Sequence, residues 1–344
     1  MKIGIVSSAV PLINGGYRFI AEWLQTHLRA RGHAAEIVYI PSADNPDTLL
    51  QQMAAFRSID LSAFERVITF RPPAHVVRHP CKVVWFIHHI RIFYDLWDGP
   101  YRPFPDTARW RALRAQIIRA DTGALTEAHS VFTNSRVVAD RLAQYNDIAA
   151  EVLYPPVLAP ERFRSGDYGN EIVCVCRVEH HKRQHLLVEA MAHTQTPVRL
   201  RLCGAATNPA YVDSLREMAK QHGVQDRISI ENRWITEDEK ADALENALAS
   251  AYVPFDEDSY GYPTIEAAHA RRCTVTVNDS GGVPEFVTDG INGLIMPPDA
   301  KALGAAFDWL YADRAWARRM GEAASERVEA LGIDWDTVIS KLLA

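Results

Sequence analysis

The sequence predicts an α/β protein made of two doubly wound, parallel-sheet domains, and three observations carry this prediction. Apolar strand-like runs alternate with longer amphipathic stretches throughout the chain, which is the pattern of parallel strands covered by helices. The chain has 344 residues, a length at which one hydrophobic core usually no longer suffices. Pro155 and Pro156 interrupt regular structure near the middle. We therefore expect a first domain over residues 1–155 and a second over residues 156–344.

Hydrophobic periodicity places the elements of the first domain. Strands are expected at residues 2–6, 35–40, 66–70, 82–87, 130–134 and 151–154. A helix is expected over residues 17–31, where apolar side chains from Phe19 to Leu28 recur at helical spacing. The arginine-rich stretch from Arg102 to Arg119 predicts a basic amphipathic helix. Such a helix either contacts a membrane surface from the first domain or is an ordinary solvated helix.

The second domain repeats the same alternation. Strands are expected at residues 172–177, 199–203, 228–231, 250–254, 274–278 and 293–296. Helices are expected at residues 184–191, 209–222, 238–249, 264–270, 284–287, from 302 onward and at 335–342. The sequence leaves open whether the last helix, at about 335–344, crosses back to the first domain. Because parallel strands present their carboxyl ends on one edge, we expect function in a cleft between the two domains.

Composition and charge narrow the class of protein. With 48% hydrophobic and 23% charged residues, the composition is that of a soluble globular protein. No apolar run reaches the roughly 20 residues that span a bilayer, and Met1-Lys2 leads directly into the first strand, so we expect a cytoplasmic protein. The net charge of −6 argues against nucleic acid as a partner. Residues 1–155 carry 17 Lys and Arg against 14 Asp and Glu, whereas residues 156–344 carry 20 against 29, so only the first half favours an anionic partner.

The cysteines and histidines do not indicate a metal or a disulfide. The five cysteines form no CxxC pair and leave an odd count. Cys174 and Cys176 lie two apart in a β-branched run and are expected to be small buried hydrophobic residues on one face of a strand. The histidine group from His180 to His185 lacks Asp, Glu or Cys partners at ligand-like spacing. We therefore expect no metal and no cofactor.

The most informative stretch is an acidic tight loop, Asp258 to Pro263, which leads into a helix carrying Glu266. Gly261 and Pro263 force an irregular connection, and the free N–H groups of the following helix point back at a ligand in that turn. Carboxylates are good acceptors for the hydroxyl groups of a hexose and a ribose. The segment therefore has the layout of a sugar-nucleotide clamp.

Arg177 and Lys182 flank a short turn between a buried strand and an amphipathic helix. Both cations therefore lie at the carboxyl edge of the second sheet, beside a helix N-terminus, where a diphosphate would bind. The alternative is an ordinary solvated basic turn, and spacing alone does not separate the two.

Three further motifs lie at sheet edges or helix starts. Gly15 and Gly16 open the first long helix, where glycine allows close backbone approach to a ligand, although a plain turn explains them equally. The dinucleotide fingerprint GxGxxG is missing there, which argues against a dehydrogenase. His88 ends the fourth strand and would reach a ligand of the second domain only in a closed state; a structural histidine is the alternative. Gly281-Gly282 precede another helix start.

Taken together, these motifs resemble family 4 of the retaining glycosyltransferases, which have the GT-B architecture of two facing Rossmann-like domains with an interdomain cleft. The resemblance covers almost the whole chain. Its matching parts, in order, are Asn14-Gly15-Gly16, His88, Val131 to Ser135, Val152 to Pro156, Arg177 with Lys182, Asp258 to Glu266, and Gly281 to Glu285. Within the family, His88 to Arg91 with Tyr94 to Trp97 is similar to a bacterial subgroup that assembles surface polysaccharide and lipopolysaccharide.

The resemblance implies roles for particular residues. The implied catalytic residues are His88, Arg177, Lys182 and Asp258, and the implied donor-binding residues are Gly15, Gly16, Glu257, Ser259, Tyr260, Gly261, Thr264 and Glu266. Arg177 and Lys182 would bind the donor diphosphate, and Glu266 would hold the ribose. The family usually has Glu eight positions before Glu266, whereas this chain has Asp258 there and Glu257 one residue earlier. Which of these two carboxylates holds the donor sugar is left open.

The implied activity is transfer of a hexose, with retention and without a metal, from a UDP- or GDP-sugar to a saccharide or lipid-linked acceptor. The departing phosphate would take the proton of the acceptor hydroxyl, so that cations and helix termini suffice to stabilise the leaving group. A sugar-nucleotide epimerase of the same architecture is one alternative. A non-catalytic nucleotide-sugar-binding subunit is the other.

Overall fold

The computed structural model describes residues 1–11, 16–99 and 102–344, and of residues 16 and 17 the backbone alone. The chain divides into two compact units. The first unit contains Met1–Pro156 together with Ile333–Ala344, and the second contains Val157–Gly332. Helix α12 (Trp335–Leu343) thus belongs to the first unit.

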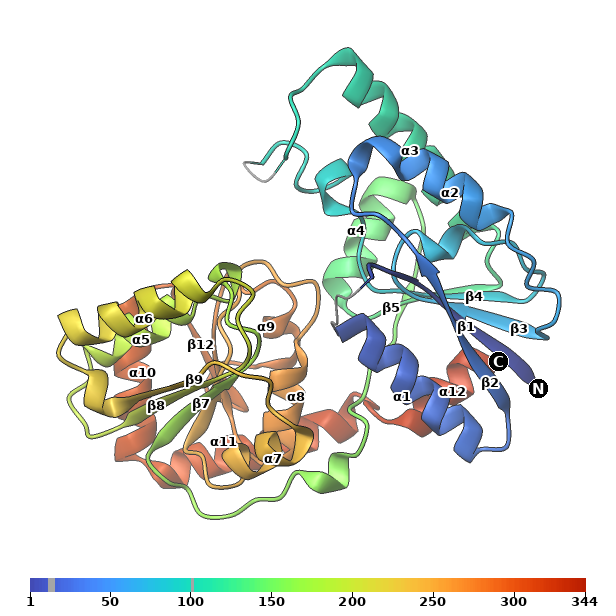
Figure 1. Ribbon diagram of the computed structural model, residues 1–344. Coiled ribbons are helices and arrows are strands. Elements are labelled where there is room, and N and C mark those ends of the chain that lie inside the picture. Colours follow the sequence, from blue (N-terminus) through green and yellow to red (C-terminus); the bar gives the residue numbers. More distant parts are fainter. Residues whose placement is uncertain (12–15, 100–101) are drawn as a thin grey trace. The chain divides into compact units, whose positions relative to one another are not determined.

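The first unit is built on a sheet whose described strands all run parallel, in the order β2-β1-β3-β4-β5-β6. The strands are β1 (Lys2–Ala9), β2 (Ala34–Pro41), β3 (Arg66–Thr69), β4 (Lys82–Phe86), β5 (Ser130–Thr133) and β6 (Glu151–Val152). The other helices of this unit are α1 (Gly16–Ala30), α2 (Leu49–Arg57), α3 (Ala108–Thr126) and α4 (Arg136–Asn146). Figure 1 shows α2 and α3 on one face of the sheet and α1 with α12 on the other. The doubly wound arrangement predicted for this part of the chain is confirmed.

The second unit contains another parallel sheet, in the order β12-β11-β10-β7-β8-β9. Its strands are β7 (Glu171–Val175), β8 (Arg199–Cys203), β9 (Ile228–Glu231), β10 (Ala249–Ala251), β11 (Thr274–Val277) and β12 (Gly293–Met296). Its helices are α5 (Gln184–Met191), α6 (Pro209–Gln221), α7 (Glu237–Glu245), α8 (Tyr262–His269), α9 (Val283–Phe286), α10 (Ala300–Ala312) and α11 (Arg314–Ala330). Leu187, Leu215 and Phe307 pack α5, α6 and α10 into one core with the strands, whereas α7 and α8 cover the opposite face (Figure 1).

Two of the expected helices differ from the sequence prediction by several residues at one end. The basic helix begins at Ala108 rather than Arg102, because prolines precede it and the Thr107 side chain accepts a hydrogen bond from the Trp110 amide at 3.4 Å as its N-cap. Helix α7 ends at Glu245 rather than residue 249, because Leu248 hydrogen-bonds to Glu171 and Ala249 begins β10. In both cases the type of element is as predicted and its boundary is not.

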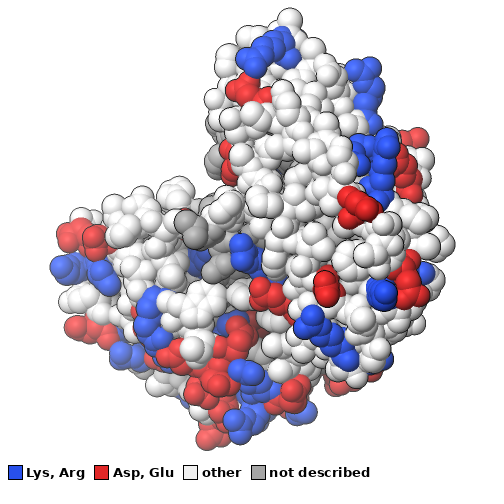
Figure 2. Space-filling model, turned by 45° about the vertical axis from the view of Figure 1, so that its right-hand side comes forward, with Lys and Arg blue, Asp and Glu red and all other residues white. Residues whose placement is uncertain are grey.

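Three arginines of α3 are engaged within the protein. Arg109 pairs with Asp47 at 2.5 Å, Arg111 pairs with Asp106 at 3.1 Å, and Arg114 donates to the Phe93 carbonyl at 2.8 Å. On the face drawn in Figure 2, described Lys and Arg side chains lie among Asp and Glu side chains. No helix of the described residues is long and apolar enough to cross a bilayer. Contact of α3 with a membrane surface stays a prediction.

Candidate active site

Lys182 occupies a buried position at the carboxyl edge of the second sheet. It lies in the 3-10 turn His180–Lys182 between β7 and α5, and 8% of its surface is exposed. Its Nζ donates to the Tyr252 hydroxyl at 2.8 Å and forms an ion pair with Glu257. The Tyr252 hydroxyl in turn donates to Glu257 Oε2 at 3.0 Å. Burying an ammonium group is costly unless it is paired, and here the carboxylate provides that pairing.

The charge balance of this triad is visible in the pKa of its members. Burial alone would raise the pKa of the Glu257 carboxyl, but the Lys182 ammonium and the Tyr252 hydroxyl outweigh burial, so that this pKa lies below its usual value. Burial and the neighbouring Glu257 charge raise the pKa of Tyr252. Each member of the Lys182–Glu257 ion pair therefore stabilises the charged form of the other. Arg177, the other predicted cation of this turn, is exposed.

The loop that follows β10 packs against the loop that follows β11. The Gly282 amide donates to the Glu257 carbonyl at 2.9 Å, and a Cβ at Gly281 would lie 2.1 Å from that same oxygen. Gly261 has φ +72°, and a Cβ there would lie 2.2 Å from the Tyr252 ring. Glycine is therefore required at both positions for steric reasons. Two motifs that are 20 residues apart in the sequence are brought together, the acidic loop and the Gly281-Gly282 turn.

Arg183, which the sequence analysis did not single out, connects the same two loops. Its guanidinium binds both oxygens of Asp279, at 2.9 and 2.6 Å, and donates to the carbonyls of Val253 and Pro254 at 2.8 Å each. Its backbone has φ +55°, a left-handed conformation that costs a non-glycine residue roughly 1–2 kcal/mol. The side-chain bonds offset this strain and fix the exit of β10 relative to the loop after β11.

We expect Arg183→Ala to lower the free energy of unfolding by about 2–3 kcal/mol, because it removes charge-assisted hydrogen bonds and keeps the strained backbone. Arg183→Gly removes the same bonds but relieves the left-handed strain, so that it should cost roughly 1 kcal/mol less. Urea unfolding followed by tryptophan fluorescence measures both variants. If the two variants are equally unstable, the strain assigned to this backbone is absent.

Helix α8 carries the predicted Glu266 into a buried site. The helix begins at Tyr262, directly after Gly261, and Thr264 Oγ1 donates to the Tyr260 carbonyl at 2.7 Å in its first turn. Glu266 is only 1% exposed, and its Oε1 accepts a bond of 2.6 Å from Lys240 of α7. Burial raises the pKa of Glu266 and the Lys240 ammonium offsets this only in part, so that the pKa lies above its usual value.

The remaining predicted residues fall in different places. Ser259 lies in the acidic loop, where its hydroxyl accepts a 3.3 Å bond from the Gly261 amide, and Asp258 lies beside it. His88 belongs to the first unit, two residues after β4, and its Nδ1 donates to the His89 carbonyl at 2.7 Å. Gly16 begins α1, and Gly15 lies outside the described residues.

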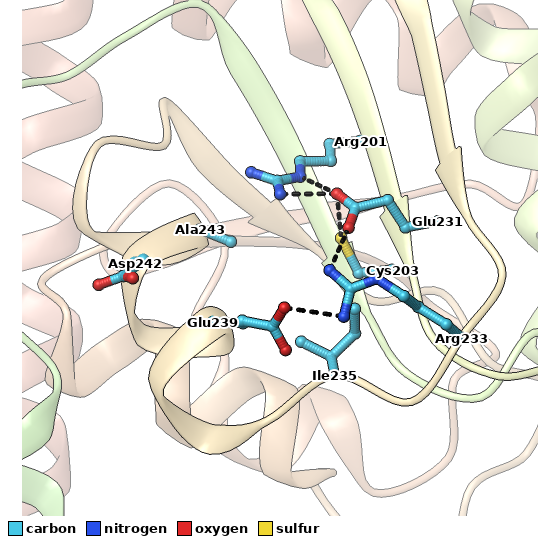
Figure 3. A pocket seen from close by; sticks show the side chains of 8 residues that line it. All are labelled: Arg201, Cys203, Glu231, Arg233, Ile235, Glu239, Asp242 and Ala243. Carbon is cyan, nitrogen blue, oxygen red and sulfur yellow. Dashed lines mark hydrogen bonds and ion pairs between the residues drawn. The ribbon is translucent and has the colours of Figure 1, made fainter.

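A pocket of about 170 Å³ lies beside α7 in the second unit (Figure 3). It is lined by Arg201, Cys203, Glu231, Arg233, Ile235, Glu239, Asp242 and Ala243. Glu231 is held on both sides, by Arg201 Nε at 2.7 Å and by Arg233 Nη2 at 2.9 Å, and Arg233 also binds Glu239 at 2.8 Å. Trp234 follows Arg233 in the chain and is 59% exposed. Most residues that line the pocket are therefore charged, and an exposed aromatic residue, Trp234, follows the lining residue Arg233 in the chain.

Metal ligands do not come together within the described ranges. No three His, Cys, Asp or Glu side chains of those residues are grouped as a metal ion would require. The sulfurs of Cys174 and Cys176 lie 3.8 Å apart, but Cys176 follows the end of β7; Cys174 is buried as expected, whereas Cys176 is half-buried.

Comparison with known proteins identifies the family. Residues 160–327 match the family model described as glycosyl transferases group 1. A GDP-mannose-dependent alpha-(1-6)-phosphatidylinositol monomannoside mannosyltransferase from Mycobacterium tuberculosis is 30% identical over 99% of this chain and 97% of its own length. An alpha-maltose-1-phosphate synthase from the same species is 32% identical over 72% of this chain and 70% of its own length.

Solved structures support the same assignment at the level of the fold. Sucrose-phosphate synthase from Thermosynechococcus elongatus superposes with a TM-score of 0.79 at 18% identity, covering 99% of this chain and 97% of that one. HepE from Anabaena, in complex with UDP, gives a TM-score of 0.72 at 15% identity, covering 100% and 98%. Both parallel-sheet units are thus those of GT-B glycosyltransferases. From the full-length similarity and the matched family model together, it follows that the chain belongs to the group 1 glycosyltransferases.

Proposed function

We propose that this glycosyltransferase moves a hexose from a UDP- or GDP-sugar to a saccharide or lipid-linked acceptor in the synthesis of surface polysaccharide or lipopolysaccharide. The observation that carries the proposal is the grouping of Lys182, the acidic loop and the Gly281-Gly282 turn at one sheet edge of the second unit. All of these residues lie within the segment that matches the family model.

The diphosphate of the donor would bind Arg177 and Lys182. Arg177 is exposed and Lys182 is buried, so the turn offers one exposed cation and one buried, paired cation. Charge-assisted hydrogen bonds from two such cations to phosphate contribute about 1.5–3 kcal/mol each. The same groups stabilise the negative charge that develops on the leaving phosphate.

The donor sugar would be held by Asp258 together with the backbone of Ser259, Tyr260 and Gly261. Glu257 is the alternative, and its carboxylate accepts from Lys182 and Tyr252. Substituting Glu257 would thus act mainly through Lys182, whereas substituting Asp258 would act on the sugar.

The pocket beside α7 is the candidate site of the donor base. Its polar lining and the neighbouring Trp234 suit a planar, hydrogen-bonding ring. The mannosyltransferase that is similar over the whole chain is GDP-mannose-dependent, which makes GDP-mannose the first donor to assay. The structural neighbour HepE was solved with UDP, which makes UDP-glucose the second.

The proposed reaction proceeds with retention at the anomeric carbon. The acceptor hydroxyl attacks from the face that the nucleotide leaves, and the departing phosphate takes its proton. The protein then has only to align the partners and to stabilise the leaving group, so neither a metal nor a cofactor is needed for the proton transfer. His88 would lie near the reactive carbon, and Gly15 and Gly16 near the phosphate and the acceptor.

The proposal is tested by donor binding and by transfer. Thermal unfolding is measured with GDP, UDP and ADP, since a ligand at 100 times its Kd stabilises the folded state by about 2.7 kcal/mol. The stabilising nucleotide selects the donor for a transfer assay with mono- and disaccharide acceptors and lipid-linked saccharides. Product that forms without acceptor and retains the nucleotide would indicate an epimerase, and donor binding without turnover would indicate a binding subunit.

We expect Arg177→Ala to lower kcat by about 10²-fold, because it removes one cation from the developing phosphate charge. The thermal midpoint should stay close to that of the wild type, since the side chain is exposed. Arg164→Ala, at an exposed arginine outside the turn, is the matched control and should leave kcat unchanged. Wild-type turnover in Arg177→Ala would rule out the assigned role.

A further inference from the structure

Lys240 and Glu266 form a buried ion pair between two helices of the second unit. Lys240 lies on α7 and Glu266 on α8, and Nζ of Lys240 is 2.6 Å from Oε1 of Glu266. The two side chains are 14% and 2% exposed. Nζ of Lys240 also binds Oε1 of Glu237 at 2.9 Å, on the preceding turn of α7. The sequence gives no sign of this arrangement, because the pair joins residues 26 positions apart.

The pair decides whether Glu266 can act as an acceptor. A carboxyl group buried without a counter-charge takes up a proton rather than remain ionised. In its protonated form it loses part of its capacity to accept hydrogen bonds. Burial raises the pKa of Glu266, and Lys240 is the neighbour that lowers it.

The other ionisable groups near Glu266 either raise its pKa or change the pKa of a different residue. Glu237 of α7 raises the pKa of Glu266 through like-charge repulsion. The pKa of Tyr262 on α8 is raised mainly by burial and further by the negative charge of Glu266. Glu161 lies in the 3-10 turn Pro160–Arg162 that packs against α8, and its charge raises the pKa of His269 rather than that of Glu266. The positive charge that faces Glu266 thus comes from α7.

Helix α7 also forms one wall of the candidate base pocket. Glu239 and Ala243 line that pocket, and Lys240 follows Glu239 directly in the chain (Figure 3). The start of the helix is fixed by a capping box between Thr236 and Glu239. One rigid element therefore carries both the wall of the pocket and the cation that binds Glu266.

We propose that Lys240 is a positioning residue for the donor ribose: it orients the Glu266 carboxylate and supplies its counter-charge, so that Glu266 accepts hydrogen bonds from ribose hydroxyl groups. Lys240 itself does not touch the donor. The inference rests on the proposed function, because it takes Glu266 as the ribose ligand. It adds that the carboxylate works only as half of an ion pair with α7.

The first test compares a nucleoside diphosphate with its 2′,3′-dideoxy analogue by isothermal titration calorimetry. GDP and dideoxy-GDP are used, or UDP and dideoxy-UDP if UDP is the stabilising nucleotide. The wild type should bind the ribose form at least about tenfold more tightly, as the loss of a charge-assisted hydrogen bond predicts. In Lys240→Met and in Glu266→Gln the preference should fall to within about twofold. The double variant should lose no more than Glu266→Gln alone, because both changes remove one interaction.

The second test uses the pH dependence of kcat/KM. Removing Lys240 raises the pKa of Glu266, so the acid limb of the profile should move to higher pH in Lys240→Met and activity should recover on the alkaline side. Removing the repulsion from Glu237 lowers that pKa, so Glu237→Gln should move the same limb to lower pH. Lys240→Arg keeps the charge and should restore most of the wild-type profile. A purely structural contact would not produce shifts of opposite sign.

The outcomes separate the inference from the proposed function. If the wild type binds both nucleotides equally, Glu266 is not the ribose ligand and that part of the proposed function fails. If the wild type discriminates and Lys240→Met discriminates equally well, the role of Lys240 is overturned while the proposed function stands. If Lys240→Met does not fold, Lys240→Arg and Glu237→Gln decide. A wild-type acid limb in Lys240→Arg together with a limb moved to lower pH in Glu237→Gln supports the role, and an unmoved limb in Glu237→Gln overturns it.

Discussion

Lys182→Met is expected to lower the transfer rate by about 10³-fold and to destabilise the second unit at the same time. The rate falls because the leaving phosphate loses a buried cation. Stability falls because Glu257 and the Tyr252 hydroxyl are left without the ammonium group that they bind. Removing one member of a buried ion pair typically costs about 3–5 kcal/mol; the partial exposure of Glu257 places this case at the lower end. Steady-state transfer and urea unfolding measure the two effects.

The double variant Lys182→Met with Glu257→Gln separates stability from catalysis. It replaces the ion pair by two neutral side chains, so most of the lost stability should return. Transfer should not return, because the cation is still missing. Recovery of transfer in the double variant would show that Lys182 serves only to balance Glu257, and would remove it from the catalytic residues.

Arg272→Met is expected to lower the stability of the second unit by about 3–5 kcal/mol, equivalent to roughly 10 °C in the thermal midpoint. The side chain is fully buried and its guanidinium donates to the carbonyls of Leu244, Glu245, Gly166 and Asp167. It also lies 3.9 Å from the centre of the Tyr168 ring. Methionine supplies no donor. The Gly166 and Asp167 carbonyls lose their bonds to Arg272, whereas the Leu244 carbonyl keeps the Ala247 amide and the Glu245 carbonyl keeps the Gly166 amide. Differential scanning calorimetry measures the shift.

Arg318→Met is the matched control for Arg272. The Arg318 guanidinium also lies over the Tyr168 ring, 4.8 Å from its centre, but Arg318 is exposed. Its loss should change stability by less than about 1 kcal/mol. Equal effects of the two substitutions would show that the ring contact, rather than the bonds to the four carbonyls, is what Arg272 contributes.

The two sheets were predictable because their strands are buried on both faces. Runs such as Ile172–Val175 and Val83–Phe86 consist almost wholly of β-branched and aromatic residues, a pattern that parallel strands impose. Helix α2 was not placed, although Leu49, Met53 and Phe56 stand at helical spacing. The end of α7 was misplaced for a different reason. Its last carbonyls, at Leu244 and Glu245, are bound by Arg272, and no local pattern reports contacts across 28 and 27 residues.

The candidate site was predictable in its motifs but not in its pairings. Glycines and acidic residues near strand ends mark the loops, and the loops do pack together. The partners of the charged residues are set by tertiary structure: Glu257 pairs with Lys182 from 75 positions away, and Glu266 pairs with Lys240. Arg183 was missed because its left-handed backbone is uncommon for arginine and leaves no trace in the sequence.

Helix α12 makes the order of synthesis matter for the first unit. Its Trp335 ring stacks on His27 of α1, its Lys341 pairs with Glu151, and Arg66 donates to the Leu342 carbonyl at 2.9 Å. The ribosome therefore releases every strand of this sheet long before the segment that covers it, with the whole of Val157–Gly332 emerging in between. During translation, the surface that the buried α12 side chains Trp335, Val338, Ile339 and Leu342 contact is therefore exposed until the second unit has been synthesised. The first unit can be completed only after the second unit has been translated.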